Sequence, residues 1–431
     1  MSTQPKNFAG HVLSRATLDC CVKCTICETQ CPVMEATPLF PGPKYVGPQA
    51  ERFRNGDSVD IAVDLCSMCG TCTLVCPQGV KIAELNTQAI AIAKSDHMPL
   101  RDRLISNTSF MGACMHPVAP VANAALKVKP LRVAVEKTVG IHRNAPMPYA
   151  PTQSLRGWLR KRDASKVQPK PNRGPLIFFY GCAGSNFEVD ASKKAIEVLE
   201  HLGYTVIVPK QGCCGQAAKS NGLFDSAAKQ TLKLCDQLIA AGADLGPEGK
   251  EIPIVGVAGS CTGMLKHEAK DIMGIDDERL ANVSKRMREW TEFIADLMDK
   301  GEFPMDELRP MPDTVLPYHE SCQVKSQYMG APAVRVMEAI PGVTVKESGR
   351  PCCGMAGTYG LKKEKYDVAQ AMGKPLFDFI KEENPEIAVC EAEPCRWHIR
   401  KGSGAKAVHP SQVIHHALGL SNDLFDRKII S

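Results

Sequence analysis

The chain has 431 residues, and its 44% apolar and 23% charged residues are an ordinary balance for a globular protein of several domains. The net charge of +5 is mild and gives no indication of a nucleic-acid partner. Twenty cysteines are many for a cytosolic enzyme, yet the polar first ten residues lack the apolar core of a secretory signal. We therefore expect the cysteines to bind metal in a reducing compartment rather than to form disulfides.

Eight of the cysteines lie in two runs with the same spacing. Both runs, at residues 21–32 and 66–77, read C-x2-C-x2-C-x3-C-P. This is the spacing of bacterial two-cluster ferredoxins, in which the fourth cysteine of each run binds the other cluster; a structural zinc site does not need the closing Cys-Pro. Two [4Fe–4S] clusters are therefore predicted, and the expected ligands are Cys21, Cys24, Cys27 and Cys76 for the first and Cys66, Cys69, Cys72 and Cys31 for the second. Cys20 lies one position too early to join them.

The first hundred residues divide into two parts. We expect a flexible tail over residues 1–17 and a mostly helical ferredoxin-type domain over residues 18–97. Within this domain, residues 61–65 and 82–94 are predicted to be helical, whereas the proline- and glycine-rich residues 40–48 exclude a regular helix.

Residues 98–172 are predicted to be a linker or a membrane-surface region. Residues 104–126 carry no formal charge, but they contain too many polar residues and prolines for a spanning helix, which needs about 20 mostly apolar residues. Four cations follow among apolar residues, and a basic run around Trp158 comes later; the cations are Lys127, Lys129, Arg132 and Lys137. This pattern suits an anionic lipid surface. A linker packed on its own domains, with solvated lysines, would have the same composition.

The rest of the chain contains an internal repeat, over residues 173–310 and 311–431. Each copy has a strand, a cysteine, a helix, a second strand, Cys-Cys-Gly and a later strand that leads to another cysteine. This alternation predicts two α/β domains with parallel sheets, whose ligands gather at the carboxyl ends of the strands. The cysteines at these ends are Cys182, Cys213, Cys214 and Cys261 in the first copy, and Cys322, Cys352, Cys353 and Cys395, with Cys390 as a further candidate, in the second. We predict a redox or metal site in each copy. The expected fold class is thus multidomain α+β.

Four further residues are weighed between a structural and a functional role. We expect Cys114 and Cys235 to be small buried residues, as many free cysteines are. His319, three residues before Cys322, is a candidate ligand or proton donor, although such a histidine is more often a hydrogen-bonded residue at the end of a strand. Trp397, beside Cys395, is expected to pack rather than to relay electrons.

Several longer motifs carry a family resemblance that covers nearly the whole chain. They include Phe40-Pro-Gly-Pro-Lys-x-x-Gly-Pro48, Cys353-Gly-Met-Ala-Gly-Thr-Tyr-Gly360 and Cys395-x-Trp397. With two ferredoxin motifs and two Cys-Cys-Gly (CCG) domains, the chain resembles the iron–sulfur subunits of respiratory flavin dehydrogenases, and in particular the family of the C subunit of anaerobic glycerol-3-phosphate dehydrogenase. Similar subunits occur in glycolate oxidase, lactate utilisation and heterodisulfide reductase.

The resemblance implies a role in anaerobic respiration and glycerol metabolism. A partner flavoprotein (the A and B subunits) would oxidise glycerol 3-phosphate, and this chain would pass the electrons to menaquinone, as a peripheral protein on the cytoplasmic face of the inner membrane. One or two further iron–sulfur clusters would lie in the CCG domains. The chain itself has no Gly-x-Gly-x-x-Gly dinucleotide motif after a strand. Glycolate or lactate oxidation is the alternative function, as is direct catalysis like that of heterodisulfide reductase.

The chain departs from heterodisulfide reductase at one point. There, each CCG domain ends in C-x-x-C and supplies five cysteines to a noncubane cluster. Here the corresponding positions hold Met264 and Ala392, and only Cys390 could substitute in the second domain. Ordinary four-cysteine clusters, or one cluster near the domain interface, are therefore at least as well supported as disulfide-reductase catalysis.

Overall fold

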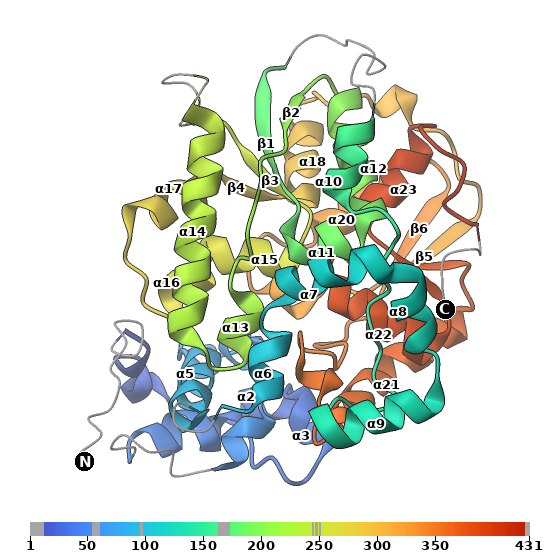
Figure 1. Ribbon diagram of the computed structural model, residues 1–431. Coiled ribbons are helices and arrows are strands. Elements are labelled where there is room, and N and C mark those ends of the chain that lie inside the picture. The colour runs from blue at the N-terminus through green and yellow to red at the C-terminus, as the bar shows by residue number, and fades with distance from the viewer. Residues whose placement is uncertain are drawn as a thin grey trace.

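The protein is described by a computed structural model over residues 13–53, 61–94, 98–162, 173–243, 245, 249 and 251–426. Most of the predicted tail, residues 1–12, lies outside these ranges. A helical N-terminal module lies beneath two α/β domains, and a string of short helices runs from this module over the front of the molecule (Figure 1). Each α/β domain holds one parallel sheet, so the predicted multidomain α+β class is confirmed.

The N-terminal module consists of short turns and one longer helix. Its elements are η1 (Leu18–Cys20), α2 (Ile26–Thr29), α3 (Pro32–Ala36), η2 (Tyr45–Gln49), η3 (Ile61–Leu65), α4 (Thr71–Leu74) and α5 (Ile82–Lys94). The helical predictions for residues 61–65 and 82–94 are confirmed. Residues 40–48 form no regular α-helix, as predicted, but part of the segment winds into the π-turn η2, which kinks at Gly47. A Cβ at Gly47 would approach Asn86 Oδ1 to 2.8 Å, so the glycine allows η2 to pack closely on α5.

The connecting region is a series of helices, several of which begin with proline. The elements are α6 (Leu100–Ile105), α7 (Thr108–Met115), η4 (His116–Val118), α8 (Ala119–Ala125), α9 (Lys129–Val139) and α10 (Leu155–Lys161). Proline lies in the first turn of η4, α8 and α9, where its missing N–H costs no helical hydrogen bond. Among the described residues, no helix has the length and apolar character needed to cross a bilayer.

The first CCG domain is a four-stranded parallel sheet with helices on both faces. Its strands are β1 (Pro175–Phe179), β2 (Thr205–Ile207), β3 (Ile254–Gly256) and β4 (Met287–Glu289), in the order β2-β1-β3-β4. Its helices are α11 (Gly181–Asn186), α12 (Val189–His201), α13 (Gln216–Ser220), α14 (Phe224–Ala243), α15 (Gly259–Gly263), η7 (Met264–Glu268), α16 (Ala269–Asp271), α17 (Glu278–Arg286) and α18 (Trp290–Asp299).

The second CCG domain repeats this topology. Its strands are β5 (Thr314–Tyr318), β6 (Val343–Glu347), β7 (Ile387–Val389) and β8 (Lys406–Val408), in the order β6-β5-β7-β8. After η8 (Met305–Glu307), its helices are α19 (Cys322–Lys325), α20 (Pro332–Glu338), η9 (Tyr359–Leu361), α21 (Tyr366–Glu383), α22 (Glu393–Ser403) and α23 (Pro410–Ala417). The matching strand orders confirm the internal repeat. The fourth strand of each sheet, β4 or β8, was not predicted.

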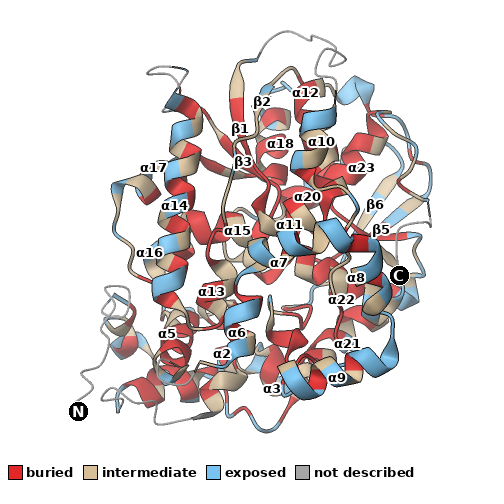
Figure 2. Ribbon diagram, viewed as in Figure 1, coloured by how far each residue is buried: buried red, intermediate tan, exposed pale blue. Residues whose placement is uncertain are grey.

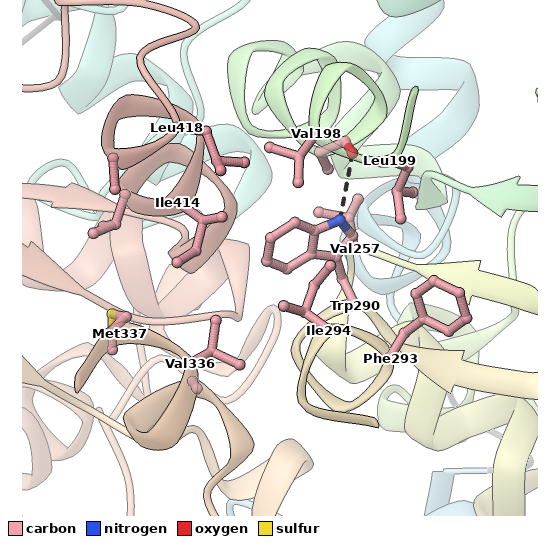
Figure 3. Packing of buried hydrophobic residues seen from close by; sticks show 14 of the residues in the cluster. Val198, Leu199, Val257, Trp290, Phe293, Ile294, Val336, Met337, Ile414 and Leu418 are labelled. Carbon is pink, nitrogen blue, oxygen red and sulfur yellow. Dashed lines mark hydrogen bonds between the residues drawn. The ribbon is translucent and has the colours of Figure 1, made fainter. Parts of the chain in front are cut away.

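An apolar core joins the two CCG domains. In Figure 3, Trp290 and Ile294 of the first domain face Val336, Met337 and Ile414 of the second. The indole Nε1 of Trp290 donates to the carbonyl of Ala195 at 3.4 Å, which satisfies the one polar atom of this buried ring. Helix α12 packs on α23, and α20 packs on α18, so each domain contributes the equivalent pair of helices. Buried residues continue through the middle of the molecule (Figure 2). The two domains are therefore held in a fixed relation.

The N-terminal module is attached to both CCG domains. Tyr359 of the second domain donates its hydroxyl to the carbonyl of Leu65 at 2.9 Å, and its ring packs in one apolar cluster with the module. Gln88 on α5 donates to the carbonyl of Ile272 in the first domain at 2.9 Å. These contacts bring the ferredoxin cysteines close to the carboxyl ends of the β-strands.

Candidate metal centres

Four cysteines line one pocket in the N-terminal module. They are Cys21, Cys24, Cys27 and Cys76, the four predicted to bind the first cluster. The loop that carries the first three alternates into the left-handed region at Lys23 and Thr25, where φ is 58° and 68°. Such alternation points successive backbone N–H groups inward and forms the nests that surround many iron–sulfur sites. Cys20 is exposed and does not line the pocket.

A second pocket is lined by the other four ferredoxin cysteines. They are Cys31, Cys66, Cys69 and Cys72. Here Met68 and Gly70 take the left-handed positions, with φ of 55° and 81°, and the Met68 N–H donates to the Cys66 sulfur at 3.4 Å. The structure thus brings a cysteine of the first run, Cys31, to three cysteines of the second, as the ferredoxin spacing predicts.

The cysteines of the first CCG domain converge beyond the ends of β1, β2 and β3. The Cys214 and Cys261 sulfurs lie 3.0 Å apart, and Cys182 interacts with Cys213. The N–H of Gly215 donates to the Cys213 sulfur at 3.5 Å. Gly215 has φ of 89°, and a Cβ there would lie 2.6 Å from the carbonyl oxygen of Ala227. The glycine of the Cys-Cys-Gly motif is therefore required for the turn that presents both cysteines.

The second CCG domain forms the equivalent site with additional donors. The Cys353 and Cys395 sulfurs lie 2.9 Å apart, Cys352 interacts with Cys322, and Cys390 lies beside Cys395. The Gly354 N–H donates to the Cys352 sulfur at 3.4 Å, as Gly215 does in the first domain. His319 joins this site, because a ring nitrogen of His319 and the sulfurs of Cys353 and Cys395 all lie within 4.8 Å of one another.

The chemistry of these donor sets fits iron–sulfur clusters. All twenty cysteines are free, and most of those named above are buried. Desolvation raises the pKa of the Cys27 thiol to about 11 and that of Cys31 to about 12. Desolvation also raises the pKa of Cys66 and Cys72 well above the ordinary value. Buried thiols in groups of four become thiolates only when a cation compensates their charge, and N–H···S bonds then stabilise the sulfurs.

The second ferredoxin pocket adjoins the second CCG site. Cys69, Cys322 and Cys352 form one buried cluster, and after desolvation the largest influence raising the pKa of Cys69 is the charge of Cys322. Helix α15, which carries Cys261, packs on α19, which carries Cys322, and a Cβ at Gly259 on α15 would meet Val324 on α19 at 2.7 Å. The second ferredoxin pocket therefore adjoins the second CCG site, and the first CCG domain packs beside that site.

The structure also tests the expectations for Cys114, Cys235 and Trp397. Cys235 is fully buried, as predicted, but the prediction for Cys114 is wrong, because it is exposed on α7. Trp397 packs on Phe187 and donates to Glu188 Oε1 at 2.7 Å, which agrees with a packing role.

In the connecting region, Arg132 is buried and donates to three carbonyls, so it is not available to a lipid surface. Trp158 packs against the domain core.

Two groups of ion pairs near the sites, one around Glu188 and one around Lys362, were not predicted. Glu188 accepts from Arg396 at 3.2 Å and from Arg400 at 2.8 Å, and so ties the first CCG domain to α22 of the second. Lys362 donates to Asp102 and to Asn221, both at 2.7 Å, and ties the second domain to α6 and to the first domain. Lys362 lies two residues after the motif Cys353–Gly360, and nothing in the sequence around it identifies these partners.

Comparison with known proteins agrees with this arrangement. Residues 17–80 match the 4Fe-4S dicluster domain, and residues 176–266 and 316–400 match the cysteine-rich domain. The chain is 31% identical to the C subunit of anaerobic glycerol-3-phosphate dehydrogenase from Escherichia coli K12, over 92% of this chain and 98% of the relative. It is 22% identical to the glycolate oxidase iron-sulfur subunit of the same strain, over 97% and 98% of the two chains. It is 27% identical to lactate utilization protein A of Oceanobacillus iheyensis, over 56% of this chain and 96% of the relative.

The extent of the first match and the presence of both domain types together show the family of this chain. The ferredoxin-type domain and both cysteine-rich domains are present in this chain, and nearly the whole of the Escherichia coli relative is covered. The chain belongs to the family of the C subunit of anaerobic glycerol-3-phosphate dehydrogenase, whose members are iron–sulfur subunits of oxidoreductase complexes.

Proposed function

We propose that this chain is the electron-transfer subunit of a membrane-associated glycerol-3-phosphate dehydrogenase, and that it passes electrons from a partner flavoprotein to menaquinone. The observation that carries this proposal is the buried contact of Cys69 with Cys322 and Cys352, which joins the ferredoxin module to a CCG site. Contiguous sites of this kind suit transfer of electrons through one chain, whereas separate structural metal sites have no need to adjoin.

The proposed ligands are the cysteines that the four sites gather. The eight ferredoxin cysteines would hold two [4Fe–4S] clusters, and the CCG cysteines would hold one or two more. When bound, such clusters supply one-electron carriers, whose potentials depend on burial and on hydrogen bonds to sulfur. The chain contributes both, since the N–H groups of Met68, Gly215 and Gly354 donate to cysteine sulfurs.

Oxidation of the substrate is assigned to partner subunits. The Escherichia coli relative is by name one lettered subunit of a dehydrogenase, which supports an assembly with flavoprotein A and B subunits. Relatives named for glycolate oxidase and lactate utilization also match this chain, so glycolate and lactate are the competing donors.

The connecting helices are the proposed membrane-binding surface, on the cytoplasmic face of the inner membrane. Large apolar side chains are exposed along α6 to α9 and the turns between them. These residues are Leu100, Leu104, Phe110, Val118, Val121, Val128 and Leu131. Exposed residues are prominent along α8 and α9 (Figure 2). Exposed lysines accompany them at positions 127, 129 and 137, and this combination favours the surface of an anionic bilayer.

Substrate-dependent bleaching tests the proposal. The complex is purified anaerobically from its native membrane, and the visible iron–sulfur absorbance is followed after separate additions of glycerol 3-phosphate, glycolate and lactate. Rapid bleaching by glycerol 3-phosphate alone is the expected result. Bleaching by glycolate or lactate instead would assign the chain to another donor. Absence of bleaching by all three, with no flavoprotein in the preparation, would contradict the proposed role.

A further inference from the structure

The two CCG sites differ at two matched positions. Phe178 pairs with Val255 in the first sheet, and Tyr318 pairs with Val389 in the second. By this register, and by equal spacing from the following cysteines, His319 corresponds to Phe179 and Cys390 corresponds to Gly256. The second site thus has a histidine and an extra cysteine where the first has neither.

The first site has no room for these donors. Phe179 is buried in the apolar core under α14, and a Cβ at Gly256 would lie 2.3 Å from Thr262 Cγ2 and 3.2 Å from the Phe179 ring. The packing of the first domain therefore excludes a cysteine at the position of Cys390. The difference between the two sites extends beyond the donor residues to the residues around them.

His319 has the surroundings of a metal ligand. It is 1% exposed, and its backbone N–H donates to the carbonyl of Val389 at 3.0 Å, which fixes the residue at the end of β5. Its Nδ1 lies 3.1 Å from the hydroxyl of Ser348. Its Nε2 is buried and makes no hydrogen bond of normal geometry among the described residues, although His319 interacts with the Cys353 thiol.

We infer that His319 binds iron at the second CCG site through Nε2, beside Cys353 and Cys395. A buried ring nitrogen without a partner costs free energy unless a ligand occupies it. Ligating histidines are usually oriented by a hydrogen bond to the other ring nitrogen, which is the role of Ser348 here. The ring nitrogen and both sulfurs lie within 4.8 Å of one another, a separation that one iron or one cluster face can bridge.

This inference deepens the proposed function and rests on it only in requiring iron at the second site. Imidazole in place of thiolate raises the reduction potential of an iron–sulfur centre, as in Rieske centres. A histidine ligand would therefore make the second CCG site a better electron acceptor than the two ferredoxin clusters, whose pockets no histidine lines among the described residues. An electron on the ferredoxin cluster held by Cys69 would then pass preferentially to the second CCG site.

Pulsed electron paramagnetic resonance on the complex labelled with 15N-histidine tests the inference. The protein is studied both as isolated and after reduction by dithionite, so the result does not depend on the physiological donor. One strongly coupled histidine nitrogen is expected. It should be lost in His319→Gln and kept in His398→Gln, a matched control whose buried ring lies near Cys353 but has both nitrogens engaged. In His319→Cys, the centre at the second CCG site should have a lower reduction potential than it has in the native complex.

Two results would overturn the inference. One is the absence of a strongly coupled histidine nitrogen in both redox states of the native complex, which needs no variant to fold. The other is a coupling that survives His319→Gln. A coupled nitrogen in a complex that glycerol 3-phosphate does not bleach would support the ligation while contradicting the proposed donor, so the two failures remain distinct.

Discussion

Cys69 of the ferredoxin module and Cys322 of the second CCG domain lie in one buried cluster, together with Cys352. The two cysteines are far apart in sequence, and they are brought together by the docking of Tyr359 on the module. The second CCG site is therefore the one that adjoins the ferredoxin cysteines, and the first CCG site follows it through the contact of α15 with α19.

Removing a CCG cysteine should lower the iron content without affecting the ferredoxin clusters. We expect Cys353→Ser to lose iron from the second site, because the substituted sulfur lies 2.9 Å from that of Cys395. Iron analysis and spectroscopy of the anaerobically purified complex would measure this loss. Cys235→Ser is the control, since Cys235 is fully buried and the charges that act on its thiol come from Asp236, Asp277 and Arg279 rather than from a site cysteine, so the variant should keep the native iron content. Equal iron content in both variants would contradict a metal site at Cys353.

Apolar side chains of the connecting helices should anchor the protein to lipid. Phe110 and Val121 are 63% and 72% exposed. Phe110→Asn should weaken binding to phospholipid vesicles by about 1.5–3 kcal/mol, or roughly tenfold or more, because a large apolar side chain no longer enters the membrane. Cosedimentation measures this partitioning. Tyr328→Asn, at a 69% exposed residue of the second CCG domain, should bind like the native protein; equal losses in both variants would contradict a localised surface.

The lysines beside these residues should make binding depend on lipid charge. Lys127→Gln and Lys129→Gln are each expected to cost about 1 kcal/mol, roughly fivefold in partitioning, on anionic vesicles. They should have little effect on zwitterionic vesicles, and added salt should reduce the difference. Lys285→Gln is the control, since Lys285 is exposed on α17 of the first CCG domain. Binding that is insensitive to lipid charge would contradict this electrostatic contribution.

The ion pair of Glu188 should make the contact between the CCG domains sensitive to acid. Arg400 and Arg396 lower the pKa of Glu188 to about 2 from an ordinary value of 4.5, despite desolvation, which acts in the opposite direction. Because the folded pKa is depressed, its contribution to stability is complete above pH about 4.5 and is lost as the pH falls toward about 2.

Glu188→Gln should therefore destabilise the domains by about 3 kcal/mol near neutral pH and by much less at low pH, since it leaves the buried Arg396 unpaired. Denaturation followed by tryptophan fluorescence would measure this, because all three tryptophans belong to α10, α18 and α22. Glu251→Gln removes an exposed ion pair with Lys285 and should change stability by less than about 1 kcal/mol. An equal effect of both variants would contradict the role assigned to Glu188.

Much of the fold could be predicted because the cysteines and the strands are local patterns. The ferredoxin spacing predicts that Cys31 and Cys76 each join the cysteines of the other run, and the repeat predicts three strands of each sheet. The fourth strands were missed because neither forms an apolar run: two of the three residues of β4 are charged, and β8 begins with a lysine. Such strands depend on pairing with β3 and β7 rather than on their own sequence.

Features that depend on tertiary contacts could not be predicted. Arg132 has the pattern of a surface cation, yet it is buried because three carbonyls from the following turn accept its hydrogen bonds. Cys114 lies in an apolar stretch, but α7 presents it to solvent. The adjacency of Cys69 and Cys322 depends on how separate domains dock, which no local spacing encodes.

Reoxidation of the ferredoxin clusters tests the central claim most directly. The complex with Cys353→Ser and Cys395→Ser is reduced by glycerol 3-phosphate, and a soluble menaquinone analogue is then added while the iron–sulfur absorbance is followed. The account predicts that bleaching of the ferredoxin clusters is unchanged and that their reoxidation by the quinone is lost, while Cys235→Ser behaves like the native complex. Reoxidation at the native rate in the double variant would contradict transfer of electrons across the contact of Cys69 with Cys322.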